Sequence, residues 1–169
     1  MDFTSKQSAR PSWLTPQRRS AVAVAARYLG ALAVLATGID HIEQYQVDNY
    51  STVPTIGTLF LLNFISAVVV SVLLIVPLGR IAGRYTDAVR AIIALGGIAI
   101  AVLSLVGLFV SETSGLFGFV EHGYRMAIAL AIVAEVAAAV LLIVFLAANG
   151  TGVEMVRSRS AGAPANADG

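Results

Sequence analysis

The chain has 169 residues, of which 57% are hydrophobic and only 12% are charged, and its formal net charge at pH 7 is +1. Charged residues make up about 25% of a typical soluble domain, so this composition leaves too little polar surface to cover a water-soluble core. The absence of cysteine excludes disulfide exchange, thiol nucleophiles and iron–sulfur ligation.

Four long apolar stretches follow a polar, basic segment over residues 1–20, which we expect to be a cytoplasmic tail. At about 1.5 Å per residue, each stretch is long enough to cross a hydrocarbon layer of about 30 Å. Pro54 and Thr55 precede the second stretch, where a helix start tolerates a missing donor and favours a cap. Residues 149–169 are rich in Gly, Ala and Ser and are expected to be disordered. The predicted spans are residues 21–39, 56–78, 88–110 and 124–148.

The breaks between the spans are short, and short connections join antiparallel neighbours. Hydrocarbon admits only helices and closed barrels, because every backbone polar group must be paired within the protein. The apolar stretches lack the alternation of barrel strands. The sequence therefore predicts an all-α polytopic membrane protein, with residues 21–148 forming an up-down-up-down four-helix transmembrane bundle and with disordered termini.

The distribution of Lys and Arg predicts how the bundle is oriented. Basic residues occur in the N-terminal tail, between the second and third spans, and in the C-terminal tail. The breaks over residues 40–55 and 111–123 contain none. Because Lys and Arg concentrate in cytoplasmic loops, we expect a plasma-membrane protein with both termini in the cytoplasm.

Small residues recur at spacings of three and four in three of the spans, and they favour close helix contact in lipid. We expect these stripes to face the interior of the bundle. Glu135 lies on the stripe of the fourth span. The stripes are Gly30, Ala33 and Thr37 in the first span, Ala94, Gly97, Ala101, Ser104 and Gly107 in the third, and Ala127, Ala131, Ala134 and Ala138 in the fourth.

Four of the polar residues within the apolar spans are candidate functional groups: Glu135, Arg27, Asn63 and Ser66. A carboxylate at this depth costs a few kcal/mol, so such groups usually face protein or water. Glu135 is either neutral, since desolvation penalises the charged form, or paired with Arg27. A functional interpretation makes it a proton- or ion-handling group. The structural interpretation, which we prefer at this point, is a hydrogen bond to Ser66, Asn63 or Arg27.

A second group of polar residues flanks the spans on the side opposite the termini. It places both histidines at one membrane surface, and if the first helix continues past Ile39, His41 and Tyr45 share a face. Imidazole and carboxylate groups can bind a divalent metal or sense pH, and they can also simply hold loops together. Tyr45 and Tyr50 are expected at the interface. The candidates are Asp40, His41, Glu43, Tyr45, Glu121 and His122.

Catalytic motifs are absent from the sequence, including GxSxG, HExxH and glycine-rich phosphate loops. We therefore expect no enzymatic activity, no nucleic-acid partner and no cofactor, although His41 and His122 leave a divalent metal or haem open. The first hypothesis is an accessory, structural or partner-binding membrane subunit, with another membrane protein or a second copy of the chain as partner. The alternatives are a small proton-coupled carrier using Glu135, and a metal- or redox-handling protein using His41 and His122.

The first hairpin carries the sequence GIDHIEQY at residues 38–45 and YSTVPTIGTLFLLN at residues 50–63. It resembles a group of small actinobacterial four-span membrane proteins of unknown function. More distantly, the glycine-then-histidine end of the first helix resembles DoxX-like four-helix membrane proteins, whose companion motifs in the third and fourth helices are missing here. The resemblance implies a membrane location and four spans, and it implies no activity and no functional residues.

Overall fold

The computed structural model describes residues 16–118, 120 and 126–161, apart from the side chains of residues 16, 127 and 151–161. The described residues are almost entirely helical, and four long helices each contain a segment long and apolar enough to cross a membrane. This confirms the predicted all-α bundle of four candidate spans. The long helices are α1 (Pro16–Val47), α2 (Ile56–Ile75), α4 (Thr86–Thr113) and α5 (Met126–Ala161), and the short connecting elements are η1 (Tyr50–Thr52), α3 (Gly79–Ala82) and η2 (Gly83–Tyr85).

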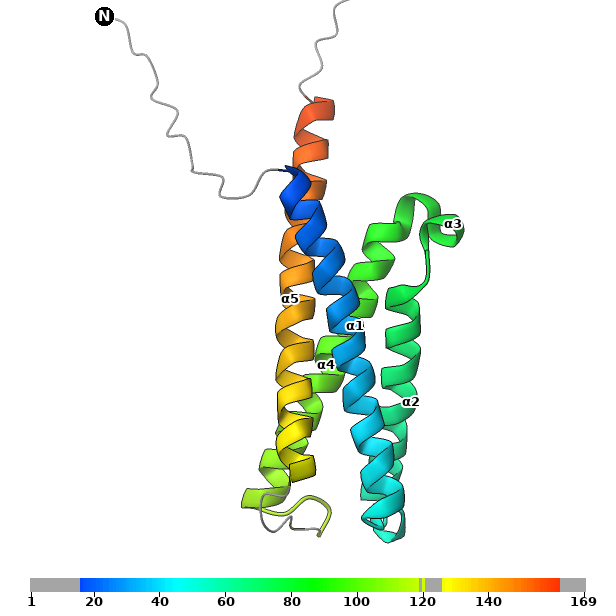
Figure 1. Ribbon diagram of the computed structural model, residues 1–169, viewed down its shortest axis with the longest axis vertical. Helices are drawn as coiled ribbons and strands as arrows, with labels where there is room; N and C mark the ends of the chain where they lie inside the picture. Colours follow the sequence, from blue (N-terminus) through cyan, green and yellow to red (C-terminus); the bar gives the residue numbers. More distant parts are fainter. Residues whose placement is uncertain (1–15, 119, 121–125, 162–169) are drawn as a thin grey trace, which may run out of the picture.

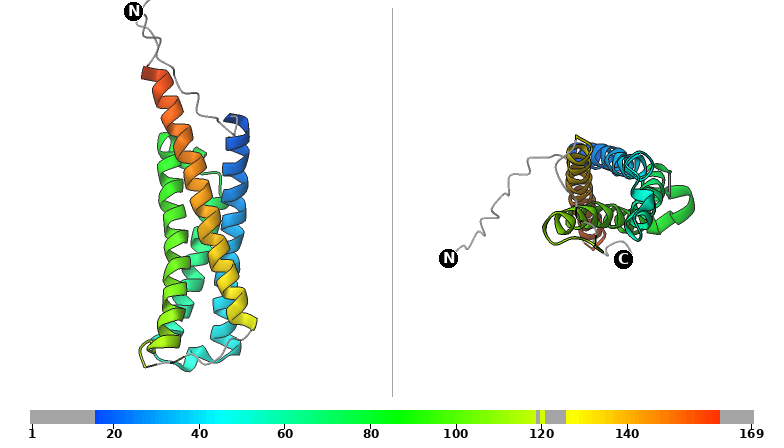
Figure 2. Two further views of the ribbon diagram at one scale, coloured as in Figure 1. Left: turned by 90° about the vertical axis from the view of Figure 1, so that its left-hand side faces the viewer. Right: turned by 90° about the horizontal axis from the view of Figure 1, so that it is seen from below.

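The four long helices alternate in direction, as Figure 1 shows. Seen along the bundle they form a four-cornered arrangement in which α1 lies between α5 and α2, and α4 completes the square (Figure 2). We call the end of the bundle that carries the start of α1, the end of α5 and α3 the upper end, as drawn in Figure 1. The lower end carries the end of α1, η1, and the end of α4.

Helix α1 is longer at both ends than the sequence predicts, since it begins at Pro16 instead of Ala21 and ends at Val47 instead of Ile39. Proline suits the first helical position, because its missing N–H would be unpaired there anyway. No Gly or Pro interrupts the chain between Ile39 and Val47, so a continued helix pairs the backbone groups of this polar run. As a result, His41 lies on a membrane helix and not in a surface loop.

The other helix boundaries also differ from the predicted ones. Helix α2 ends at Ile75 and not at Leu78, because the residue before Pro77 avoids the helical region, and Val76 is indeed extended. Helix α5 continues through Gly150 to Ala161, where the sequence predicts a disordered tail from residue 149. This part of α5 contains Gly150 and Gly152, each of which costs a helix only about 1 kcal/mol. Residues 1–15 and 162–169, the rest of the predicted disordered termini, lie outside the described residues.

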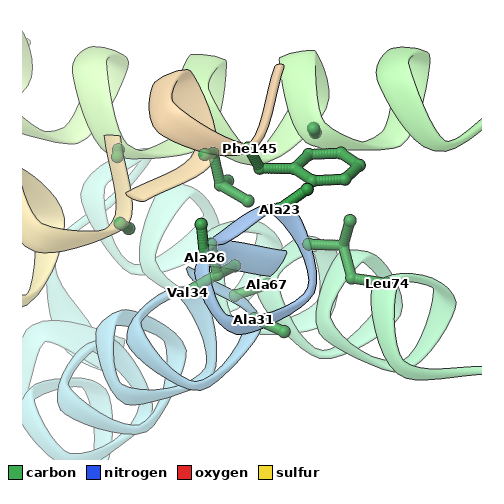
Figure 3. Close-up of a cluster of buried hydrophobic side chains, with 11 residues drawn as sticks. Ala23, Ala26, Ala31, Val34, Ala67, Leu74 and Phe145 are labelled. Carbon is green, nitrogen blue, oxygen red and sulfur yellow. The ribbon is translucent and has the colours of Figure 1, made fainter. Parts of the chain in front are cut away.

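Much of the buried core consists of alanine, and Figure 3 labels several of these residues. Part of each predicted small-residue stripe is buried. Ala94, Gly97 and Ala101 of α4 are buried, as are Ala131 and Ala138 of α5, whereas the side chain of Ala127 lies outside the description. Two large side chains of the same α5 face, Leu142 and Phe145, are also buried, although they are not part of the predicted stripe.

Leu142 packs where three helices meet. A Cβ atom added to Gly30 of α1 would lie 2.7 Å from Leu142, and one added to Gly97 of α4 would lie 2.6 Å from it. The two glycines therefore form the recess that receives this leucine. Nearby, Ser71 of α2 donates a hydrogen bond of 2.9 Å to the carbonyl oxygen of Ala31 in α1, which pairs a polar side chain that would otherwise be buried unsatisfied.

Candidate functional site

A cavity of about 300 Å³ lies among the four helices near the lower end of the bundle. This volume is at the small end of the range for small-molecule sites, which are mostly apolar and contain a few convergent polar groups. Most of the described lining residues are Leu and Ile or other apolar residues. The polar side chains at its wall that contact one another are His41, Asn63, Ser104 and Glu135.

These four side chains form one network to which every long helix contributes a residue. The Nδ2 atom of Asn63 in α2 donates to the Oγ atom of Ser104 in α4 at 2.5 Å. That Oγ atom lies 3.4 Å from Nε2 of His41 in α1, and it is close to the carboxyl group of Glu135 in α5. The Oε1 atom of Glu135 is 4.0 Å from His41 Nε2. The network therefore ties together all four corners of the bundle.

The hydrogen bond from His41 to Thr37 shows which ring nitrogen carries the proton. Its Nδ1 atom lies 2.9 Å from the carbonyl oxygen of Thr37, one helical turn earlier. Because a carbonyl oxygen can only accept, Nδ1 carries a proton and donates it. In the neutral ring, Nε2 is therefore an acceptor that faces Ser104 and Glu135. One further proton, on either Nε2 or the carboxyl group, leaves the His41–Glu135 pair with no net charge.

Glu135 is only 2% exposed and faces the interior, as its place on the small-residue stripe predicts. It lies seven residues into the candidate span Ile128–Gly150, or about 10 Å along the helix. An ionised carboxylate is strongly disfavoured at such a depth without a partner. His41 supplies that partner at 4.0 Å, and both side chains form part of the cavity wall, so the pair can take up or release a proton there.

Aromatic rings close the cavity toward the lower end. Phe60 of α2 lies 4.9 Å from the His41 ring, centroid to centroid. Tyr50 of η1 is stacked on Phe60 at 4.8 Å with an interplanar angle of 9°. Tyr50 is buried and not an exposed interfacial residue as the sequence suggests. Both rings therefore belong to the cavity wall.

Arg27 does not take part in this network. It precedes His41 by 14 positions on the same helix, which separates them by about 21 Å. Arg27 is only 8% exposed, its guanidinium lies 4.5 Å from the ring centroid of Tyr28, and its Nε atom has no hydrogen-bond partner. The partner that the sequence proposed for Glu135 is therefore replaced by His41, because the longer α1 changes which α1 residues lie at the depth of Glu135.

The remaining candidates lie around the lower end. Asp40 accepts a 2.5 Å hydrogen bond from Nε2 of Gln44, one turn later on α1. Glu43 is exposed and Tyr45 is half-buried. Ser66 is exposed at the cavity rim and makes no recorded contact with Glu135. Of these four candidates only Ser66 lines the cavity, and none has a hydrogen bond to a member of the network.

Glu121 and His122 lie outside the described residues, so the predicted metal site formed by His41 and His122 stays a prediction. Among the described residues, no three His, Asp or Glu side chains are close enough together to hold a metal ion. His41 itself faces Glu135 inside the bundle. The sequence analysis named His41 but placed it at the membrane surface, whereas the structure places it inside the bundle.

Sequence reasoning identified Glu135 and Asn63 but named Ser104 only as a small packing residue, and it missed the pairing of His41 with Glu135. The sequence contained a pattern from which the inward position of His41 could have been predicted. Gly30, Val34, Thr37, His41 and Gln44 are all buried and follow one another at alternating spacings of four and three. This is the period of a helix face in a bundle, and continuing it past Ile39 places His41 inside.

Comparisons with protein-family models, curated proteins and solved structures find no match to this chain. The function is therefore argued from the site itself.

Proposed function

We propose that this integral membrane protein is a small proton-coupled carrier that binds its ligand in the cavity and exchanges a proton at the Glu135–His41 pair. The observation that carries the proposal is the position of that pair, which is buried at membrane depth yet forms part of the wall of a cavity. Ionisable residues inside membrane spans are costly, and they mark ion pathways and proton relays.

The network also explains why such a pair would be kept. A carboxyl group needed only to hold helices together could be replaced by an uncharged polar residue at lower cost. Here the carboxyl group faces an imidazole whose second nitrogen is already committed to Thr37, so the proton has two alternative positions. A ligand that binds beside the pair changes which position is preferred, and this coupling is the basis of exchange.

The alternative of an accessory or partner-binding subunit, or of a homo-oligomer, stays a prediction from the sequence. It rested on small-residue faces that could seat another helix. In the structure, Ala94, Gly97 and Ala101 are buried within the bundle, so they already serve contacts inside one chain. The kinship with actinobacterial four-span and DoxX-like proteins likewise stays a proposal, and it adds no activity.

We also propose that the bundle lies in the plasma membrane with its upper end in the cytoplasm. Arg80, Arg84 and Arg90 lie at the upper end, and the described residues of the lower end include no Lys or Arg, as the positive-inside rule requires. The natural chain has no cysteine, so single-cysteine variants are specific. A membrane-impermeant maleimide should label Thr52→Cys and not Ile81→Cys in intact cells, and the reverse pattern would overturn the orientation.

The carrier proposal can be tested with purified protein in proteoliposomes that contain the pH dye pyranine and hold a pH gradient. Different classes of solute are added in turn: organic cations, neutral alcohols, carboxylates and sugars. We expect at least one class to dissipate the gradient through the wild-type protein. Glu135→Gln should abolish this flux while the protein remains helical and monodisperse, and Glu43→Gln, which changes an exposed carboxylate on α1, should leave it intact.

Two outcomes would contradict the proposal: no solute class moves protons, or Glu135→Gln behaves like the wild type. If Glu135→Gln does not fold, Glu135→Asp decides, because it keeps the acid and only shortens its reach. A folded Glu135→Asp protein whose flux has a shifted pH profile supports the carrier. A folded Glu135→Asp protein with unchanged flux and pH profile contradicts it.

A further inference from the structure

We propose that the ligand of the cavity is a lipophilic ammonium ion, that is, an amine with a protonated nitrogen attached to a compact apolar or aromatic body. This inference deepens the proposed function, since it uses the same cavity. It does not depend on transport, because it concerns which chemistry the cavity binds.

Within the polar network, the atoms of Asn63, His41 and Glu135 that are left without a partner are mainly acceptors. One N–H of Asn63 Nδ2 is used on Ser104, and the Oδ1 atom of Asn63 is buried without a hydrogen-bond partner. Nε2 of neutral His41 is an acceptor because Nδ1 holds the ring proton. The carboxylate of Glu135 only accepts. A ligand that satisfies these atoms must therefore donate hydrogen bonds, as an ammonium group does with up to three N–H bonds.

The charge of the residues that line the cavity also favours a cationic ligand. Among the described residues that line the cavity, none is Lys or Arg, and Glu135 is the only Asp or Glu. Asp40 acts on Glu135 as a second negative charge from α1. A buried charge without a partner costs several kcal/mol, so an anionic ligand would be excluded. A cation, in contrast, would neutralise the carboxylate.

The apolar part of the wall fits the body of such a ligand. An aromatic face attracts a cation within about 6 Å of the ring centroid. Phe60 and Tyr50 both line the cavity, and each ring covers one face of the other. Leu59 and Leu62 of α2 and Leu103 of α4 line the cavity and are also exposed at the bundle surface. The cavity therefore reaches the lipid-facing side formed by α2 and α4, where an amphiphilic amine would enter from the bilayer.

Binding of the cation must displace a proton. If the pair holds one proton before binding, R–NH₃⁺ enters, the proton leaves to solvent, and the carboxylate then faces the ammonium group. Charge and atoms balance with one proton released for each cation. Among the described residues, the titratable groups around Glu135 are His41 and Asp40 of α1 and the cavity-lining Tyr50, and the lining residues of α2 and α4 add none. Cation and proton therefore compete for one site.

Three naphthalene probes of nearly equal size separate the possibilities: 2-naphthylmethylammonium, 2-naphthylmethanol and 2-naphthoate. Their binding to purified protein in lipid nanodiscs is measured by titration calorimetry between pH 6 and pH 8. We expect the ammonium probe to bind at least tenfold more tightly than the alcohol, and the carboxylate to bind most weakly. Ammonium affinity should fall about tenfold for each unit of decreasing pH, as exchange for one proton requires.

Glu135→Gln should remove the preference for the ammonium probe over the alcohol, and Asn63→Leu should reduce it. Glu43→Gln serves as the matched control and should bind like the wild type. The inference is overturned if the alcohol or the carboxylate binds as well as the ammonium probe, or if the preference survives in folded Glu135→Gln protein. If that variant does not fold, the inference is overturned when binding of the ammonium probe to the wild type does not depend on pH.

The two proposals fail in different ways. Selective, proton-releasing ammonium binding without any flux in proteoliposomes would remove the carrier and leave the ligand assignment intact. Conversely, Glu135-dependent proton flux driven by a neutral or anionic solute would support a carrier and overturn the ligand assignment.

Discussion

Replacing Leu142 by alanine should destabilise the bundle, and a second substitution should partly undo the damage. Leu142 is fully buried between Gly30 and Gly97. In soluble proteins, Leu→Ala changes cost about 2.7–5.0 kcal/mol, which includes the transfer of the lost carbon groups out of water. At about 0.8 kcal/mol for each of three carbon groups, that transfer accounts for about 2.4 kcal/mol.

In a bilayer the transfer contribution largely disappears, because a separated α5 helix would still be surrounded by lipid. What remains is the lost packing and the unfilled recess, which we expect to cost about 1–2 kcal/mol. Gly97→Ala alone should also destabilise, by about 1–3 kcal/mol, since its Cβ would lie 2.6 Å from Leu142. In the Leu142→Ala background that clash is absent, so the double variant should be at least 1 kcal/mol more stable than the sum of the single effects predicts.

The assay is unfolding in mixed micelles of increasing SDS content, followed by energy transfer between dyes on Ser20→Cys and Ile81→Cys. Leu130→Ala is the matched control, because Leu130 lies on the same helix but is 59% exposed and faces lipid. We expect the control to change the free energy of unfolding by less than about 0.5 kcal/mol. If Leu142→Ala and Leu130→Ala cost the same, or if the Leu142 and Gly97 effects simply add, the packing of α1, α4 and α5 around Leu142 is wrong.

Two further changes test contacts elsewhere in the bundle with the same unfolding assay. Ser71→Ala removes the hydrogen bond to the carbonyl oxygen of Ala31 and should cost about 0.6 kcal/mol, as interhelical hydrogen bonds in membranes do on average; an unchanged unfolding midpoint would show that the bond is not made. Gly57→Ala should be more damaging, because the new Cβ would lie 2.6 Å from the backbone oxygen of Tyr50, whereas Gly79→Ala meets nothing within 4 Å. Equal stability of the two glycine variants would contradict the close approach of η1 to α2.

The sequence alone determined the spans and their helical state. A hydrocarbon layer dictates both the length of an apolar stretch and the pairing of its backbone groups, so four spans could be read without knowing any tertiary contact. The inward face of α4, with Ala94, Gly97 and Ala101, followed from the same reasoning, because close contact in lipid requires small side chains. The small-residue stripe of α5 predicted in the same way that Glu135 faces the interior.

Only the tertiary structure decided which residues meet. The sequence ended the first span at Ile39, where hydropathy falls, but backbone pairing carries α1 on to Val47. That extension places His41 inside the bundle beside Glu135 and Ser104. Hydropathy reports the affinity of a segment for lipid, whereas the position of a polar side chain depends on helix continuity and relative helix depth. The cavity among the four helices exists only once those depths are set.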